Sequence, residues 1–287
     1  MRHDESNRPH LGTSKRSDSR LQGTDHAVIA PVSERLRRFG IRADKALGQH
    51  FLVSEGAVRR ITESVADMAG ILEVGPGPGA ITLPLSLAHP VLAIELDERW
   101  RDLLAHYCPD VEVIYQDALQ ADLATHLEAL PAPRAVVSNM PYNITGPLLA
   151  AFSAQAGRVE RLVLMMQKEV ADRIIAPAGD AKRGALSVVM QAQFAVKWQQ
   201  TVPPGAFAPP PKVQSAVLEF TPRAALPAGW AEFVHAGFRQ PRKTLANNLR
   251  ERGGAALIES AGLAASIRPH QLTEVEWQTL WSHSKVN

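Results

Sequence analysis

The chain has 287 residues, of which 45% are hydrophobic and 21% charged, and its net charge is +2. These values are ordinary for a globular protein with a well-buried core, and no apolar stretch reaches the ~18 residues of a membrane span. The single cysteine, Cys108, excludes a disulfide framework and a cysteine-rich zinc site, and no metal is expected. Because the first residues carry charge where a secretion signal needs an apolar core, we expect a cytoplasmic protein without a membrane segment.

The N-terminal segment 1–27 is rich in Ser, Arg, Asp, Asn and Gly, so it is expected to be a disordered basic tail. Beyond it, Val32, Leu36 and Phe39 predict a short amphipathic helix ended by Gly40.

Basic residues concentrate in two places. Residues 1–48 hold ten Lys and Arg against six acids, and a second cluster comprises Arg239, Arg242, Lys243, Arg250 and Arg252. Two such segments are a weak footprint for nucleic acid, and solvated helix faces explain the charges about as well.

Short apolar runs alternate with helix-length connections between about residues 55 and 166. The runs are Ile71–Val74, Val91–Ile94, Val111–Ile114, Ala135–Val137 and Leu162–Met166. This pattern predicts an α/β fold with a mostly parallel sheet covered on both faces. Two later runs, Ser187–Val196 and Ser215–Phe220, are interpreted as closing strands of that sheet. A Pro-rich linker then leads into a helical pattern, so we expect a catalytic domain over 28–222 and a small α-helical domain over 223–287.

A glycine-rich loop follows the first long strand, with glycines at 75, 77 and 79 and Glu73 two residues before the first. This E-x-G-x-G-x-G spacing differs from the dinucleotide pattern G-x-G-x-x-G, and an acid suits the ammonium and sulfonium groups of S-adenosylmethionine. Glu95 ends the next strand, where it can accept the ribose hydroxyls, and Asp117 follows the third, within reach of the adenine amino group. We therefore predict a Rossmann-like, class I S-adenosylmethionine-dependent methyltransferase sheet. The alternative, a purely structural turn with solvated acids in the loops, is less favoured.

The fourth strand runs into Asn139-Met-Pro-Tyr142, which resembles the N/D-P-P-Y/F element of methyltransferases that modify amino groups. The Asn139 side-chain carbonyl and a main-chain carbonyl near Pro141 could accept the two hydrogens of an exocyclic amine and aim its lone pair. Tyr142 can stack on a base taken out of its helix. The alternative is an Asx-Pro turn that closes the strand, with Tyr142 in the core.

The whole pattern resembles the KsgA-type ribosomal RNA adenine dimethyltransferases over about Lys45–Leu249. The pieces that carry the resemblance are Leu47–Leu52, Glu73–Gly79, Ile94–Asp97, Gln116–Asp117, Asn139–Tyr142, Met166–Arg173, Phe207–Ala216 and Phe238–Leu245. The resemblance implies transfer of methyl groups to N6 of two adjacent adenosines near the 3′ end of 16S rRNA, with the small ribosomal subunit as partner, RNA binding by the helical domain and action as a monomer.

By the same resemblance, the cofactor pocket includes the chain around His50 and Leu52, with Gly75, Gly77 and Asn139 beside the three acids. Phe207 stands where this family has an aromatic that sandwiches the target base against Tyr142. Lys168 and Lys212 are candidate phosphate contacts, although a scaffold role is the default for their segments.

Two residues depart from the family pattern. His50 stands where Asn is common, and Pro241 stands where Arg is usual, so one basic RNA contact is lost.

Three other interpretations compete. An enzyme that methylates a single adenosine of large-subunit rRNA shares the cofactor loop and Asn-x-Pro-Tyr, but fits Phe207–Ala216 less well. An NAD-type dehydrogenase leaves Asp117 and Asn139–Tyr142 without a role. A non-catalytic RNA-binding factor would be expected to carry a damaged glycine loop or Asn-x-Pro-Tyr element, and both motifs are intact here.

Overall fold

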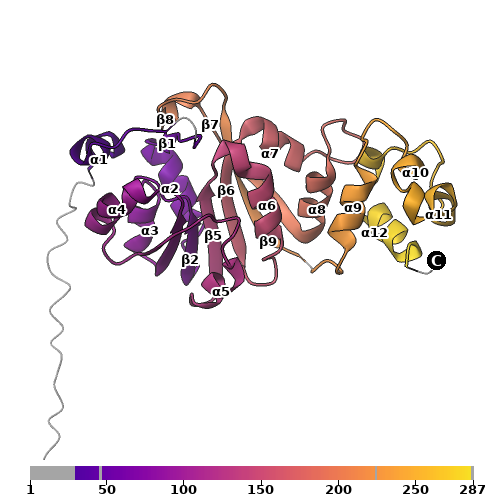
Figure 1. Cartoon of the computed structure of the whole chain (residues 1–287), viewed down its shortest axis with the longest axis horizontal. Coiled ribbons are helices and arrows are strands. Elements are labelled where there is room, and N and C mark those ends of the chain that lie inside the picture. Colours follow the sequence, from indigo (N-terminus) through magenta and orange to yellow (C-terminus); the bar gives the residue numbers. More distant parts are fainter. Residues whose placement is uncertain (1–29, 45–46, 224, 286–287) are drawn as a thin grey trace, which may run out of the picture. The chain divides into compact units, whose positions relative to one another are not determined.

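The computed structural model describes residues 30–44, 47–223 and 225–285, and the described residues from Pro31 onwards form one compact unit. The predicted tail over 1–27 lies outside the described residues. Within the described residues the main sheet has seven strands in the order β4-β3-β2-β5-β6-β9-β7 (Figure 1). Its strands are β2 (Gly70–Val74), β3 (Val91–Glu95), β4 (Glu112–Tyr115), β5 (Arg134–Asn139), β6 (Arg161–Gln167), β7 (Phe194–Val202) and β9 (Ser215–Pro222).

The strands from β4 to β6 are parallel, whereas β9 pairs antiparallel with both β6 and β7. All five predicted parallel strands are confirmed, and so is the strand predicted over Ser215–Phe220. Two-residue strands β1 (Phe51–Leu52) and β8 (Phe207–Ala208) form a separate antiparallel ribbon.

Successive residues of each central strand face opposite layers of helices. In β2, Ile71 packs with α2 (Glu55–Glu63) and α3 (Thr82–Ser86), while Leu72 packs on the opposite face. That second face is covered by α5 (Leu123–Glu128), α6 (Thr145–Ser153), α7 (Lys168–Ile174) and α8 (Ala185–Gln193). Because both faces are buried, the strands read as continuous apolar runs.

The predicted N-terminal helix is confirmed as α1 (Val32–Phe39), which ends at Gly40 with φ of 64°. It packs with α4 (Arg101–Tyr107) in a cluster that includes Phe51 and Trp100.

The interpretation of Ser187–Val196 as a strand is wrong for most of its length. Residues up to Gln193 form α8, and the strand β7 begins only at Phe194. Met190 of this helix packs against the sheet, whereas Val188 and Val189 pack among the C-terminal helices. Burial on two sides removes the polar face that would show a helical period, and periodicity then cannot separate a buried helix from a strand.

The C-terminal helices surround their own apolar cluster, in which Trp230, Phe233 and Trp277 are fully buried. These helices are α9 (Trp230–Gly237), α10 (Leu245–Asn248), α11 (Gly254–Ser260) and α12 (Glu274–His283). Because α8 also contributes to this cluster, the helices continue the packing of the catalytic part, and the boundary predicted at 222/223 stays a prediction. The 3-10 turns are Glu98–Trp100, Tyr142–Ile144, Pro204–Ala206, Arg250–Arg252 and Pro269–Gln271. None of the helices in the described residues has the length and hydrophobicity that crossing a bilayer requires.

Candidate active site

The glycine loop turns from β2 towards α3 through three residues with positive φ: Gly75 at 76°, Gly77 at 51° and Gly79 at 74°. Side chains with a Cβ atom rarely adopt these angles, so the spacing of the motif follows from the path of the backbone. The buried guanidinium of Arg35 donates from Nη1 to the carbonyls of Pro78 (3.1 Å) and Gly79 (2.9 Å). Sequence analysis did not identify this contact, because Arg35 lies more than forty positions away.

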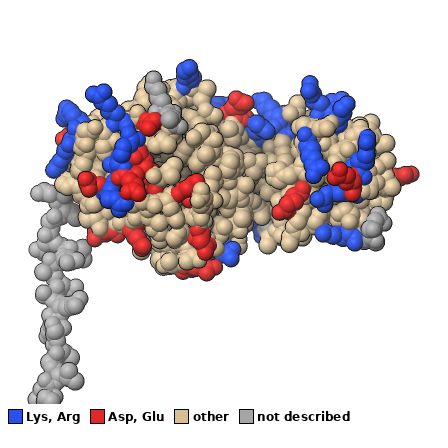
Figure 2. Space-filling view, viewed as in Figure 1, with Lys and Arg blue, Asp and Glu red and all other residues tan. Residues whose placement is uncertain are grey.

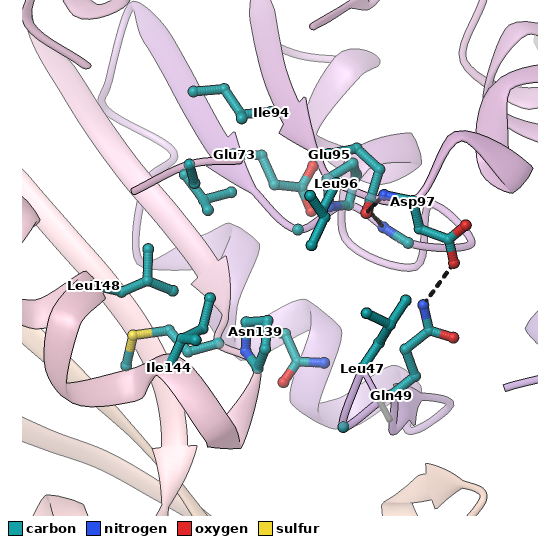
Figure 3. Close-up of a pocket in the computed structure, with 18 of the residues that line it drawn as sticks. Leu47, Gln49, Glu73, Ile94, Glu95, Leu96, Asp97, Asn139, Ile144 and Leu148 are labelled. Atoms are coloured by element: carbon teal, nitrogen blue, oxygen red, sulfur yellow. Dashed lines mark hydrogen bonds between the residues drawn. The ribbon is translucent and has the colours of Figure 1, made fainter. Parts of the chain in front are cut away.

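A pocket opens at the carboxyl ends of β2, β3, β4 and β5. Ten of the eleven predicted site residues line it: His50, Leu52, Glu73, Gly75, Gly77, Glu95, Asp117, Asn139, Pro141 and Tyr142. Figure 3 shows Glu73 and Glu95 close together, with the Asn139 amide across the pocket from them. The edge of the sheet therefore gathers the residues that four separate motifs predicted, as expected for parallel strands.

Glu73 is the most deeply buried acid of the pocket, with 1% of its surface exposed. Its Oε2 atom has no hydrogen-bond partner among the described residues. Loss of hydration raises the pKa of Glu73 to about 8, and the nearby charge of Glu95 adds to the rise. A buried carboxyl group without a partner beside a pocket fits a cationic group of a ligand.

Glu95 is held by the main chain at the end of β3. Its Oε2 accepts a hydrogen bond from the Gly77 N–H (2.9 Å), and its Oε1 accepts one from the Asp97 N–H (2.8 Å). Burial raises the pKa of Glu95 despite these two bonds. Asp117 is more accessible, and its Oδ1 accepts a bond from the Leu119 N–H (2.9 Å). Both carboxylates are thus oriented by backbone donors before any ligand is bound.

A strap formed by residues 47–52 closes one side of the pocket. The Gln49 side chain donates from Nε2 to Asp97 Oδ2 (2.8 Å) and accepts at Oε1 from the Asp44 N–H (2.8 Å). Burial alone would raise the pKa of Asp97, but hydrogen bonds from Arg99 and Gln49 bring the pKa of that carboxyl below its ordinary value. Sequence analysis marked both motifs but not this pairing, because the two residues lie 48 positions apart.

The Asn139 amide reaches the same strap, donating from Nδ2 to the main-chain carbonyl of His50 (3.2 Å). The His50 imidazole donates from Nδ1 to the Pro209 carbonyl (2.8 Å) and stacks on the Tyr142 ring, with centroids 5.5 Å apart. Tyr142 is anchored in turn by a 2.5 Å hydrogen bond between its hydroxyl and Ser215 Oγ.

Phe207 is the predicted site residue that the structure does not bring to the pocket. Only 3% of its surface is exposed, and it packs in the core with Leu52, its partner in the β1–β8 ribbon. The expected position across a base from Tyr142 is therefore not seen. The aromatic ring that faces Tyr142 is His50.

Apolar side chains complete the pocket wall, and sequence analysis did not select them. Leu96, Leu119, Ile144 and Leu148 all line it, and Leu96 keeps 56% of its surface exposed. The sequence signal is a leucine directly after Glu95, beyond the end of a predicted strand, and its exposure in the structure marks it as part of a binding surface.

Comparison with known proteins gives one consistent family. The family model for ribosomal RNA adenine dimethylase matches residues 40–272. A ribosomal RNA small subunit methyltransferase A from Gluconobacter oxydans is 40% identical over 265 residues, covering 88% of this chain and 86% of that protein. The protein of that name from Phenylobacterium zucineum is 42% identical over 252 residues, covering 84% and 88%.

Solved structures support the fold. A dimethyladenosine transferase from Plasmodium falciparum has a TM-score of 0.66 at 22% identity and covers 80% of this chain and 96% of its own. The 23S rRNA methyltransferase ErmE has a TM-score of 0.57 at 24% identity, covering 82% and 99%. The predicted class I methyltransferase fold is therefore confirmed. The chain belongs to the ribosomal RNA adenine dimethylase family, and its cofactor is S-adenosylmethionine.

Proposed function

We propose that this protein transfers methyl groups to N6 of two adjacent adenosines near the 3′ end of 16S rRNA, giving N6,N6-dimethyladenosine during small-subunit maturation. The observation that carries the proposal is the Asn139–Tyr142 element, which lies at the pocket across from the unpartnered acid Glu73. The names of the curated relatives support the small subunit as the substrate. We further propose that the protein acts as a monomer in the cytoplasm.

The residues of the pocket fit the cofactor group by group. Glu73 would face the positively charged groups, Glu95 the ribose hydroxyls and Asp117 the adenine amino group. Gly75, Gly77 and the strap around His50 and Leu52 would complete the contacts. When bound, S-adenosylmethionine supplies a methyl group activated by its sulfonium. Since Glu73 and Glu95 both lose hydration in the pocket, a cation bound there would lower the pKa of each.

Asn139 would position the target amine. Its Nδ2 already binds the His50 carbonyl, so Oδ1 is the atom with which the side chain can accept an amine hydrogen. The Pro141 carbonyl accepts bonds from Ile144 N–H and Thr145 Oγ1, both at 3.2 Å, which favours the Met140 carbonyl as the second acceptor. Two acceptors draw the nitrogen towards tetrahedral geometry and direct its lone pair, and the displaced proton can leave to water.

RNA binding would use basic side chains outside the pocket. Figure 2 shows Lys and Arg side chains over the C-terminal helices, where Arg239, Lys243 and Arg250 line one hollow. Glu251 partly neutralises Arg239 at 3.6 Å. Lys168 pairs with Asp172 at 3.0 Å and lies over the Trp198 ring, which supports its scaffold role more than a phosphate contact.

The test uses small ribosomal subunits and naked 16S rRNA from a strain that lacks the modification. After incubation with protein and S-adenosylmethionine, mass spectrometry of the digested rRNA should show N6,N6-dimethyladenosine, and primer extension should stop at two adjacent adenosines near the 3′ end. The proposal fails if cofactor-bound protein modifies neither substrate. Large-subunit rRNA is incubated in parallel, and a primer-extension stop on that RNA would instead support the single-adenosine enzyme.

A further inference from the structure

The His50 imidazole covers the ring on which the target base is expected to stack. The two ring centroids are 5.5 Å apart with an interplanar angle of 29°, which is direct offset stacking. The hydrogen bond from Nδ1 to the Pro209 carbonyl holds the imidazole in this position. Both rings line the pocket, on the side where Asn139 contacts the strap.

The space between these rings is too small for a base. A base sandwiched between two rings needs them roughly 7 Å apart, twice the 3.4 Å spacing of stacked bases. The observed separation leaves room for no third ring. An adenine can therefore stack on this face of Tyr142 only after the imidazole has moved.

We propose that His50 is a specificity-determining residue. Its imidazole occupies the stacking position of the target adenine on Tyr142 until a base displaces it. This inference rests on the proposed function, and it names how the same site admits its base. The imidazole acts as a competitor, so only a base that stacks on Tyr142 better than the imidazole does can enter.

The exchange breaks two side-chain contacts of His50 and none of its main-chain contacts that hold Asn139. Rotation of the imidazole breaks its bond to the Pro209 carbonyl and its contact with Tyr142. The bond from Asn139 uses the main chain of His50, so the amide that aims the amine stays in place. Tyr142 also stays in place because its hydroxyl is bonded to Ser215. The stacking position on Tyr142 is thus vacated while Asn139 and Tyr142 stay in place.

His50→Asn is the direct test, because Asn can still donate to the Pro209 carbonyl but has no ring to stack. With unmethylated small subunits, kcat/KM should rise about three- to tenfold, the ratio that corresponds to one aromatic contact. The affinity for S-adenosylhomocysteine, measured by calorimetry, should stay within about twofold, since the main chain of the strap and its bond to Asn139 are kept. His50→Phe keeps a ring over Tyr142 and should show no rise. His235→Asn, on the exposed surface of α9, is the matched control.

A second measurement follows the imidazole itself. In the free protein the Tyr142 ring should shield the His50 ring protons, so their NMR signals should lie upfield. An RNA hairpin with two adjacent adenosines in its loop, added with S-adenosylhomocysteine, should move these signals downfield.

Two results would overturn the inference. Unchanged kcat/KM in His50→Asn would show that the imidazole does not compete with the base. If kcat/KM fell in His50→Asn but stayed at the wild-type value in His50→Phe, the ring at position 50 would be a surface on which the base stacks. Failure of wild-type protein to methylate either substrate is a different result, because it removes the proposed function before any variant is compared.

Discussion

The Asn139 side chain and the His50 main chain are joined by a 3.2 Å hydrogen bond that spans 89 positions of sequence. It connects the strap over the pocket with the end of β5, so the amide proposed to aim the amine is oriented by the strap. The donor nitrogen is used in this bond, and the acceptor oxygen remains for the substrate.

Replacing Asn139 should therefore separate binding from turnover. In Asn139→Ala the cofactor should still bind measurably, whereas kcat should fall about 100-fold or more, as for the loss of one positioned polar group. Asn139→Asp keeps oxygen acceptors but loses the bond to His50, so its kcat should be intermediate. Calorimetry with S-adenosylhomocysteine and single-turnover methylation measure the two quantities. An alanine variant with nearly full turnover would rule out the proposed role.

The raised pKa of Glu73 predicts a pH dependence of cofactor affinity. Burial raises this pKa to about 8, so at neutral pH the free protein holds Glu73 mostly as the neutral acid. A bound cation favours the ionised form, and affinity for S-adenosylmethionine should rise as pH increases through about 8. Glu73→Gln should bind more weakly at pH 8.5 and lose this rise. Equal pH profiles for the two proteins would contradict the contact.

The raised pKa of Glu73 should make the ligand-free protein less stable as pH rises, whereas cofactor affinity rises with pH. Because the folded-state pKa lies above the ordinary value of 4.5, the folded state holds more protons than the unfolded state between about 4.5 and 8. The contribution of Glu73 to the free energy of unfolding should fall as pH rises through this interval. In denaturation experiments without ligand, Glu73→Gln should lack this fall. Above pH 8 it should be more stable than the wild-type protein.

The sequence predicted the parts of the site that local chain features determine. Glu73, Glu95 and Asn139 each lie at or beside the end of an apolar run, so the edge of a parallel sheet brings them together. Contacts between distant segments were not predictable, and the bond between Gln49 and Asp97 depends on how the strap folds back. The surroundings of Phe207 were not predictable because a motif gives its position in the chain but not the packing of its side chain, which lies in the core beside the β1–β8 ribbon.

The Gln49–Asp97 bond should stabilise the closed pocket. Gln49→Ala removes a hydrogen bond to a carboxylate and frees the strap, so the cofactor Kd should rise about tenfold. Gln278→Ala, on an exposed position of α12, should leave this Kd unchanged. Calorimetry with S-adenosylhomocysteine measures both. An unchanged Kd in Gln49→Ala would mean that the strap keeps its position without this bond.

A buried ion pair should fix the C-terminal helices to the catalytic part. The Arg183 side chain is fully buried and contacts Glu274 of α12, the Ala176 carbonyl and Gln191. Glu274→Gln leaves this cation without its counter-charge, and because Glu274 is about one-third exposed, the loss of unfolding free energy should be about 2 kcal/mol. The exposed pair Arg101–Glu98 gives the control, and Glu98→Gln should cost less than about 1 kcal/mol. Equal costs in urea denaturation would contradict the proposed difference.

Gly237, at the end of α9, should tolerate no side chain because Trp277 occupies the space beside it. A Cβ atom there would lie 2.4 Å from the Trp277 ring and 3.1 Å from Leu245, and that ring is itself stacked on Phe238. Gly237→Ala should therefore lower the free energy of unfolding by about 2 kcal/mol or more and change the near-ultraviolet circular dichroism of the tryptophans. Gly146 in α6 has open space around its Cα, so Gly146→Ala should be neutral or stabilise by up to about 1 kcal/mol. If Gly237→Ala were as stable as Gly146→Ala, the cluster around Trp277 would have to be loose enough to shift, and its ring stacking would contribute little to the packing of the C-terminal helices.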